Sequence, residues 1–450
     1  MGKRRMKINM DRLIKEILVV VALFLPASIF TQEILNLENV IRIGLENNYD
    51  LKIVRNEQQI SDNNVTPGNA GFLPTLGLNS GYNIRESSGD NIPAADNRSE
   101  VTTSGTQTFD AAVNLNWTLF EGFKVQTNHK RLKELQTIGE LNTRLSIEDF
   151  IANISAEYYN FVQQRQLFKN LQQAVDLSRE RLRIVEARYQ IGSFSRLDLQ
   201  QAKVDFNTDS SQLIQQYEVL HSSRIKLNEL MGSHNPERTF SAADSTINVN
   251  RLLQKSELYD DMMRNNTSLL LSEKNKVLSE LDLKTLQSQN YPYLRLNGSY
   301  GFTHYNYNTG SLDQQRNWGP SAGITLGFNI FDGFNRKREQ KNARIRINNQ
   351  ELQVDRQKLY LQSDFANMWL AYQNNIQLAM LEKESLENAQ LNYEIAMERY
   401  LLGDLSGILL REAQVSLLNA EQRLVNAQYR TKLYEISLMQ ISGRVVEMVR

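Results

Sequence analysis

The chain has 450 residues, and its 51 lysines and arginines are balanced by 51 aspartates and glutamates. This balance excludes a strongly cationic protein and predicts no nucleic-acid partner, and the absence of cysteine excludes a fold stabilised by disulfides. Only seven prolines occur, and residues 124–231 and 335–450 contain none. Such stretches are typical of very long helices rather than of several compact domains.

The first 31 residues have the composition of a secretory signal peptide. Six basic side chains precede an apolar run from Ile17 to Leu25, which Pro26, Ala27 and Ser28 follow. Basic, apolar and small residues in this order are typical of an export signal. No later apolar stretch approaches the roughly 18 residues that a membrane-spanning helix requires. We therefore expect an exported chain that is either soluble outside the cytoplasm or crosses a membrane by strands.

The rest of the chain contains two similar halves. The motif Phe120-Glu121-Gly122-Phe123 recurs 211 positions later as Phe331-Asp332-Gly333-Phe334. At the same offset, segment 189–195 resembles segment 400–406, with Tyr, Gly and Ser in equivalent places. Self-similarity over such lengths indicates a tandem duplication. We therefore expect a first repeat at residues 32–240 and a second at residues 241–450, with equivalent geometric roles.

Hydrophobic periodicity predicts the same order of elements in each repeat. The first repeat should contain a helix, strands near 74–84 and 110–120, a long helix over 122–190 and a returning helix over 196–231. The second should contain a helix, strands near 292–302 and 321–331, a long helix over 333–401 and a returning helix over 407–442. Apolar and polar residues alternate in the strands, whereas the long helices have the spacing of a coiled-coil seam.

The strands are compatible with an ordinary half-buried sheet, but their context favours a membrane. Each hairpin is predicted to close with a long polar loop, residues 85–109 and 303–319, as expected at an external face. Four strands cannot close a barrel, and an open sheet edge is not tolerated in lipid. Three chains would supply twelve strands, whereas two would supply eight and leave little lumen. A barrel of this kind must therefore be shared between chains.

Four residues mark the predicted junctions between strands and helices. Gly122 and Gly333 occur where a strand becomes a helix, a change of direction that requires backbone freedom. Pro74 and Pro292 occur at the first residue of a strand, where a missing N–H group costs least.

The other end of each long helix has a predicted turn. Gly192 and Gly403 are expected to end the long helices, and Ser195 and Ser406 to cap the returning helices. On these residues alone, the turns are ordinary connections within a helical hairpin.

The order of elements and the motifs Phe-(Glu/Asp)-Gly-Phe and Tyr-x-x-Gly-x-x-Ser resemble the TolC-type outer-membrane efflux proteins. The resemblance covers about residues 33–443. It implies a mixed α and β membrane protein in which duplicated helix–hairpin–helix repeats assemble as a homotrimer. A twelve-stranded barrel in outer-membrane lipid would continue into a long helical coiled-coil tunnel, so most of the chain would lie in the periplasm of a Gram-negative bacterium.

The resemblance further implies the exit duct of a tripartite efflux or type I secretion system. Such a duct is passive, and it docks onto a periplasmic adaptor and an inner-membrane RND or ABC pump. The adaptor is expected to dock at two tips, which consist of Gly192, Ser193, Phe194 and Ser195 in the first repeat and Gly403, Asp404, Leu405 and Ser406 in the second.

Three residues match positions at the tunnel entrance of this family. Asp198 and Tyr400 match residues that lock neighbouring tips together, and Glu412 matches an acidic ring inside the tunnel. The basic partner expected two residues after Gly403 is Leu405 in this chain, so that part of the lock differs. The alternative is that Asp198 and Glu412 are ordinary solvated helical acids.

The family often has Asn-Pro near the first helix of each repeat. This chain has Asn48-Tyr49 and Asn266-Thr267 instead, so we expect a less rigid turn at these places.

Nothing in the sequence indicates catalysis. The four histidines are scattered, and none lies at metal-ligand spacing from a carboxylate. Phosphate-binding loops and nucleophile motifs are absent, so we expect no enzyme, no cofactor and no metal. Two other classes remain open. One is a soluble periplasmic coiled-coil scaffold, and the other is a diffusion porin, which would need many more strands per chain.

Overall fold

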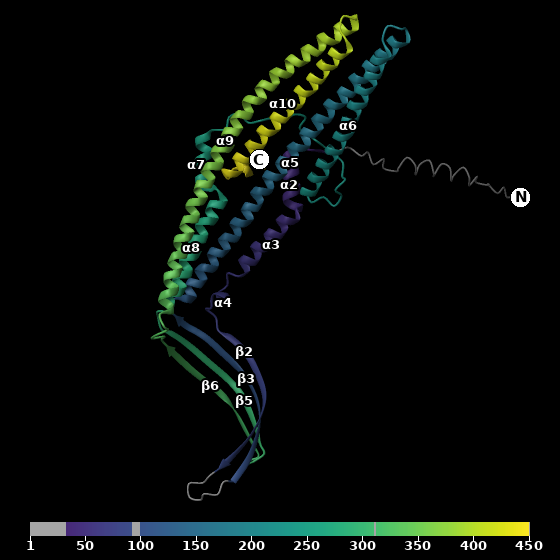
Figure 1. The fold of residues 1–450 in the computed structure, drawn as a ribbon. Helices are drawn as coiled ribbons and strands as arrows, with labels where there is room; N and C mark the ends of the chain where they lie inside the picture. The colour runs from purple at the N-terminus through teal and green to yellow at the C-terminus, as the bar shows by residue number, and fades with distance from the viewer. Residues whose placement is uncertain (1–32, 92–99, 310–311, 450) are drawn as a thin grey trace, which may run out of the picture.

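The computed structural model describes residues 33–91, 100–309 and 312–449. The molecule is elongated, with long helices at one end and a sheet at the other (Figure 1). The predicted signal peptide, residues 1–31, lies outside the described residues. Within the described ranges, no helix combines the length and the hydrophobicity that crossing a bilayer requires.

The elements follow the same order in both halves of the chain, apart from the short helix α4 in the first half and a 3₁₀ helix at the end of the second. In the first half they are β1 (Glu33–Leu35), α2 (Leu37–Asn47), α3 (Tyr49–Asn63), α4 (Pro67–Ala70), β2 (Thr75–Asn91), β3 (Glu100–Glu121), α5 (Lys124–Gln190) and α6 (Arg196–Leu230). In the second they are β4 (Phe240–Ala242), α7 (Lys255–Asn265), α8 (Thr267–Ser288), β5 (Tyr293–Tyr307), β6 (Gln314–Gly327), α9 (Asn335–Leu402), α10 (Gly407–Ile441) and the 3₁₀ helix η1 (Val445–Val449). Helices α5 and α9 contain 67 and 68 residues, so each is roughly 100 Å long.

The four long strands form one antiparallel sheet in the order β2-β3-β5-β6. Strand β3 pairs with β5, with Trp117 opposite Leu296, so the hairpins of the two halves are joined. Strands β2 and β6 have a partner on one side only among the described residues. The side chains of Leu78 on β2 and Leu326 on β6 are exposed. The sheet therefore presents apolar side chains and two open edges to its surroundings.

The first hairpin is longer than predicted. Strands β2 and β3 continue through most of segment 85–109, for which composition predicted a polar loop. Hydroxyl pairs connect the strands there: the oxygens of Ser87 and Ser104 are 2.9 Å apart, and those of Ser88 and Thr103 are 3.1 Å apart. Cross-strand pairs of this kind stabilise a hairpin without hydrophobic alternation, so the prediction of a loop was wrong.

Strand β6 begins and ends earlier than predicted, at Gln314 inside the predicted loop 303–319 and at Gly327 rather than near residue 331. Gly327 lies opposite Tyr293, the residue at which β5 begins. Residues 328–331 therefore have no opposing strand within the described chain, and they lack the inter-strand hydrogen bonds that define a ladder. The side chain of Ile330 in this segment is exposed.

The long helices pack as two antiparallel hairpins, α5 with α6 and α9 with α10 (Figure 1). Helix α5 also packs against α10, so α6 and α9 form the two lateral edges of this helical array. The larger apolar cores lie around Tyr158 and Leu227 in the first half and around Phe365 and Met262 in the second. Near the turns the apolar cores are small, so polar contacts carry more of the stability there.

Candidate functional site

The two helical turns have the same backbone geometry. Gly192 and Gly403 have φ angles of +80° and +83°, a left-handed conformation that glycine adopts without strain. The N–H group after each glycine donates to a helical carbonyl at 2.9 Å, from Ser193 to Arg188 and from Asp404 to Arg399. Both long helices therefore end in the hydrogen-bond pattern typical of a glycine C-cap.

The serines after the turns cap the returning helices. Ser406 Oγ accepts a hydrogen bond from the Leu409 N–H group at 3.4 Å, and Ser195 Oγ accepts one from the Asp198 N–H group at 3.2 Å. The Asp198 carboxylate in turn accepts from the N–H and hydroxyl groups of Ser195 at 3.0 and 2.7 Å. This reciprocal arrangement is a capping box, so the described hydrogen bonds of Asp198 lie within its own turn.

Tyr400 is buried between the two hairpins. It is only 1% exposed, and its ring packs against Phe194 with the centroids 6.3 Å apart. The Arg188 guanidinium lies 5.5 Å from the Tyr400 ring centroid and donates to the Leu401 carbonyl at 2.9 Å. Burial raises the pKa of the Tyr400 hydroxyl, and Arg188 opposes this effect. Arg188 thus joins α5 to the end of α9.

Asp198 and Tyr400 line one small cavity between the tips. Its volume is about 150 Å³, and Arg181, Asp205 and Leu405 also line it. Among the described residues, neither the Tyr400 hydroxyl nor the Nη1 group of Arg181 has a hydrogen-bond partner. Leu405 occupies the place where a base was expected and packs into the apolar tip core. The positive charge beside Tyr400 instead comes from Arg188 and Arg181, both on α5.

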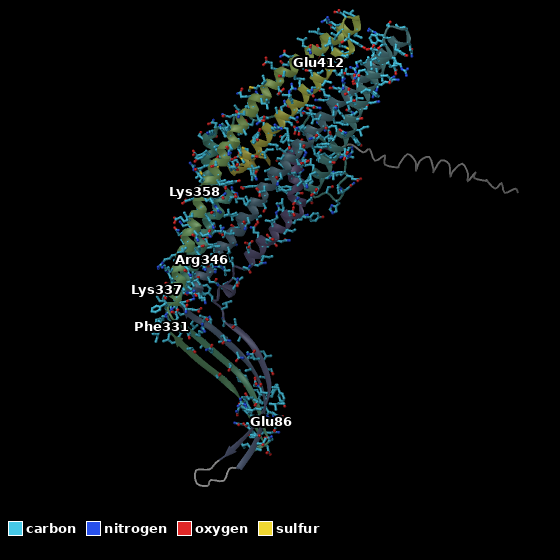
Figure 2. All side chains as sticks on the ribbon, viewed as in Figure 1. Glu86, Phe331, Lys337, Arg346, Lys358 and Glu412 are labelled. Carbon is cyan, nitrogen blue, oxygen red and sulfur yellow. The ribbon has the colours of Figure 1, made fainter. Side chains whose placement is uncertain are left out.

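Glu412 lies apart from this cavity. Its side chain is exposed on α10 and borders a groove that Leu409 and Arg399 also line. The next residue, Ala413, is buried in the tip core, and this orientation of the helix directs Glu412 outward. Figure 2 shows Glu412 toward the turn end of the helical array.

A group of charged residues that the sequence analysis missed joins three helices. Arg181 of α5 forms an ion pair with Asp205 of α6, and Arg411 of α10 donates two hydrogen bonds of 2.7 Å to the Asp209 carboxylate. The side chain of Asp209 is 1% exposed and that of Arg411 is 20% exposed. We refer to these four residues as the buried charge cluster.

Neutral polar side chains complete the buried charge cluster. The Ser178 hydroxyl donates to Asp209, and the Gln414 amide donates to Ser178 Oγ at 3.1 Å. The Gln201 amide donates to Asp205 at 3.0 Å. The available signal was the spacing of Asp205 and Asp209, which puts two acids on one helical face. A solvated face has the same spacing, so the sequence could not distinguish the two.

Four large apolar side chains at the tips were also missed. Ile191 and Leu402 precede the turn glycines and are 77% and 85% exposed, and Leu197 and Ile408 follow the capping serines and are 77% and 75% exposed. The two pairs are equivalent, because each is related by an offset of 211 residues. Apolar side chains gathered on a surface typically mark a contact with another protein.

The strand–helix junctions lie at the opposite end of the helices. Gly122 and Gly333 have φ angles of +57° and +68°, and Phe123 and Phe334 follow with positive φ as well. A Cβ atom on Gly122 would lie 2.1 Å from the carbonyl oxygen of Ser288, whereas at Gly333 the nearest atom would be 3.7 Å away. Both junctions require a positive φ angle, which glycine adopts without strain. Only at Gly122 is there also no space for a Cβ atom.

Aromatic side chains surround the junctions. Pro74 and Pro292 directly precede β2 and β5. The rings of Phe123, Phe331 and Phe334 are exposed at this level, and Figure 2 shows Phe331 where the sheet meets the helices. Aromatic residues at strand ends are typical of a membrane–water interface.

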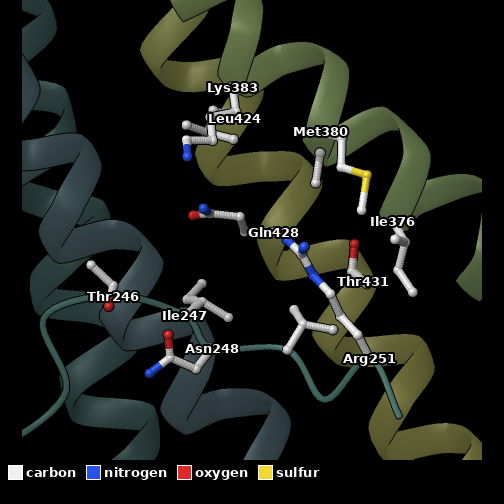
Figure 3. Close-up of a pocket in the computed structure, with 12 residues that line it drawn as sticks. Thr246, Ile247, Asn248, Arg251, Ile376, Met380, Lys383, Leu424, Gln428 and Thr431 are labelled. Atoms are coloured by element: carbon white, nitrogen blue, oxygen red, sulfur yellow. The ribbon is translucent and has the colours of Figure 1, made fainter. Parts of the chain in front are cut away.

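A large cavity lies beside the segment that connects the two halves (Figure 3). It has a volume of about 700 Å³ between residues 246–251 and helices α9 and α10, and Met380 and Gln428 line it. None of its lining residues in the described chain is an Asp, a Glu or a His. The connecting segment is anchored on both sides, because Arg165 donates to the Ala242 carbonyl at 2.7 Å and the Asn250 N–H group donates to Glu435 at 2.9 Å. This cavity therefore lacks the carboxylates and imidazoles of acid–base chemistry.

Metal-ligating residues are also not brought together in the part of the chain that the structure describes. Its ranges contain no group of three His, Asp or Glu side chains that could hold an ion.

Comparisons with known proteins agree with this architecture. The sequence model of the family described as "Outer membrane efflux protein" matches residues 40–233 and 258–444. The chain is 21% identical to the outer membrane efflux protein BepC of Brucella suis over 89% of this chain and 83% of that protein. It is 20% identical to the outer membrane protein TolC of Escherichia coli over 92% and 83% of the two chains. The crystal structure of the Campylobacter jejuni CmeC outer membrane channel has a TM-score of 0.73 at 17% identity, covering 91% and 85% of the two chains.

Proposed function

Since the chain belongs to the outer membrane efflux protein family, we propose that three copies form a passive exit duct from the periplasm to the cell exterior. The family consists of outer-membrane channels and not of enzymes, and it gives no support to the alternative of a soluble periplasmic scaffold. The helices lie in the periplasm and the sheet lies in the outer membrane.

The open edges of the sheet carry this proposal. Strands β2 and β6 each leave one row of backbone N–H and C=O groups without a partner among the described residues. In hydrocarbon, each unsatisfied group costs several kcal/mol, so β6 of one copy must pair with β2 of the next until the ring closes. Three copies of four strands give twelve strands, which enclose a lumen.

The helical edges support the same assembly. Helix α9 exposes Ile345, Leu352 and Leu359 at seven-residue spacing, and α3 exposes Tyr49, Ile53 and Ile60 at spacings of four and seven. Figure 1 shows α9 and β6 along one edge of the molecule and α3 and β2 along the other. Repeats of this kind are typical of coiled-coil seams, and these side chains are left exposed by the described residues of one chain. Neighbouring copies would cover both seams.

We further propose that residues 32–240 and 241–450 are two repeats, and that the duct is closed at the tips. Asp198 and Tyr400 would control the entrance, and Glu412 would contribute one carboxylate per copy to a negative ring that favours cations. The two tips, residues 192–195 and 403–406, would dock a periplasmic adaptor that links the duct to an inner-membrane pump. The four exposed apolar residues beside them are the surface for that contact.

Single-channel conductance in a planar bilayer tests this function. Wild-type protein should show a small conductance. The conductance should rise in the double variant Asp198→Ala/Tyr400→Phe, because its two substitutions remove polar groups from the cavity between the tips. Asp176→Ala/Tyr360→Phe is a matched control, since both of those side chains are exposed. Folded protein that forms no channel would contradict the proposed function.

A further inference from the structure

Five exposed basic side chains lie at the sheet end of the long helices. We refer to them as the basic collar: Lys130 and Lys133 of α5, and Lys337, Lys341 and Arg344 of α9. None of the five forms an ion pair with a residue in the described ranges. Lys124 and Arg131 beside them are paired, with Glu121 at 3.2 Å and with Asp282 at 3.0 Å. The basic collar is therefore a set of positive charges that the described chain does not neutralise.

The two repeats carry this charge at equivalent places. The offset of 211 residues relates Lys130 to Lys341 and Lys133 to Arg344. Lys337 has no such counterpart, because Gln126 stands at the equivalent position. All collar residues lie within the first ten residues of their helices, which is roughly 15 Å of helix. Helix α9 thus carries more collar charge than α5, and its additional lysine is closest to the sheet.

The helical face that carries the collar lies on the outside of the proposed duct. Lys133 and Ile151 are separated by 18 residues, or about five helical turns, so they lie on the same face of α5. Ile151 is buried in an apolar core with Phe240 and Ile247 of the segment that connects the two halves. A layer of chain on the lumen side would obstruct the duct, so this face is the outer face of the helical wall.

The collar lies next to the level at which the sheet would leave the membrane. The exposed rings of Phe331 and Phe334 mark that level, because aromatic side chains concentrate where a bilayer meets water. Figure 2 shows Lys337 beside Phe331, on its helical side. Lysine and arginine side chains have long apolar stems that let the charged group extend toward lipid phosphates. Their attraction to a charged surface acts at short range, since the screening length is about 8 Å at physiological salt.

A second copy of the chain does not neutralise the collar. If β6 of one copy pairs with β2 of the next, the next copy brings α4 to this level, since α4 precedes β2. Helix α4 lies beside the start of α5, where Asn128 donates to the Ala70 carbonyl at 3.3 Å. Residues 64–70 contain no Asp or Glu. Charge complementarity therefore favours an anionic surface outside the protein.

We infer that the basic collar binds the headgroups of anionic phospholipids in the periplasm-facing leaflet of the outer membrane. Basic residues next to a membrane segment attract acidic lipids through their phosphate charge, and three copies would surround the duct with fifteen such side chains, five from each copy. This contact would fix the depth at which the sheet sits in the bilayer. The inference rests on the proposed duct, because the sheet must lie in the membrane.

Electron paramagnetic resonance of spin-labelled lipids tests the inference in reconstituted phosphatidylcholine bilayers. The spectra separate lipids held at the protein surface from free lipids, and they yield the ratio of the association constants of phosphatidylglycerol and phosphatidylcholine. For the wild type this ratio should be about threefold or more at about 0.05 M salt, and it should approach one at about 0.5 M salt. The variant Lys337→Gln/Lys341→Gln/Arg344→Gln should have a ratio close to one at both salt concentrations.

A matched control removes the same charge from α9 further from the sheet. Arg356→Gln/Lys358→Gln/Lys383→Gln begins 12 residues beyond Arg344, roughly 18 Å along the helix, and should keep the wild-type ratio. Equal association of both lipids with the wild type would overturn the inference and would leave an acidic protein as the partner of the collar. A preference that survives in the collar variant would also overturn it.

Conductance of the same preparations separates the inference from the proposed function. A wild-type channel that shows no lipid preference would overturn the inference alone. A lipid preference in folded protein that forms no channel would support the collar and contradict the duct. The collar variant should conduct as the wild type does, because none of its three substitutions lies near the cavity between the tips.

Discussion

The side-chain amide of Asn48 donates a hydrogen bond to the backbone carbonyl of Leu230 at 3.1 Å. The same residue accepts from the Leu51 N–H group at 3.2 Å, so it caps α3 and fixes α3 to the end of α6. Asn266 has the same two roles in the second half, with a bond of 2.9 Å to the Ile441 carbonyl. Each asparagine therefore anchors its turn with two hydrogen bonds, while the lower rigidity expected without a following proline stays a prediction.

Replacing Asn48 or Asn266 with Ala should destabilise the protein by about 1–3 kcal/mol, because a helix cap and a partly buried hydrogen bond are both lost. Chemical unfolding followed by circular dichroism measures this change. Asn56→Ala is the matched control, since Asn56 is exposed on α3 and should change stability little. Equal stability of the Asn48 and Asn56 variants would contradict the capping role.

The two junction glycines should respond differently to alanine. Gly122→Ala combines a positive φ with a Cβ atom only 2.1 Å from the Ser288 carbonyl oxygen, and should cost about 3–5 kcal/mol. Gly333→Ala meets only the backbone strain, about 1–2 kcal/mol. Gly323, where a Cβ atom has open space, is the control. The yield of protein that resists heat in detergent ranks the three variants, and equal yields for Gly122→Ala and Gly333→Ala would refute the argument.

The buried charge cluster predicts a difference between single and double substitutions. Asp209→Asn leaves Arg411 with only the 3.9 Å contact to Asp205 and should cost about 3–5 kcal/mol, whereas Asp209→Leu/Arg411→Met should recover most of that loss. Amide hydrogen exchange of residues 407–418 reports the change locally, because loss of the pair should raise exchange in this part of α10. If the double variant exchanges as fast as the single one, the pair is not what holds α10.

Glu421 predicts a pH dependence of stability. Burial raises the pKa of this carboxyl above its ordinary value of 4.5. The folded state therefore binds more protons than the unfolded state above pH 4.5, and the contribution of Glu421 to stability falls as pH rises through its folded pKa. Glu421→Gln should be more stable than the wild type at pH 7 and similar near pH 4. Melting curves across this range check the sign, with the exposed Glu387 changed to Gln as the control.

The exposed tip residues should control binding of a periplasmic adaptor. Ile191→Ser/Leu402→Ser removes apolar surface that no core uses, and should weaken binding at least about tenfold without loss of assembly. Surface plasmon resonance with a purified adaptor measures the affinity. Leu252→Ser is the control, because Leu252 is equally exposed but far along the chain from both turns. Unchanged affinity in the tip variant would place the docking surface elsewhere.

Much of the architecture could be predicted from the sequence because its causes are local. The periodicity of apolar side chains along one segment predicted the long helices α5 and α9. The residues at and after Gly192 and Gly403 predicted the turns, because these residues themselves form the caps. The family resemblance followed from the order of such local signals and from their double occurrence. The length of the β2–β3 hairpin was underestimated because its stabilising contacts are not local. Pairs such as Ser87 and Ser104 can be recognised only once the register of the two strands is known.

The contacts that bind the tips together were decided by tertiary structure alone. Asp209 and Arg411 are separated by 202 residues. The sequence around an aspartate on a helix looks the same whether its carboxylate is solvated or paired with a distant arginine. Their pairing depends on the register in which three helices pack, which sets burial and hence the strength of the charge interaction. The local sequence therefore determined which helices and strands form, while packing determined which side chains hold the tips together.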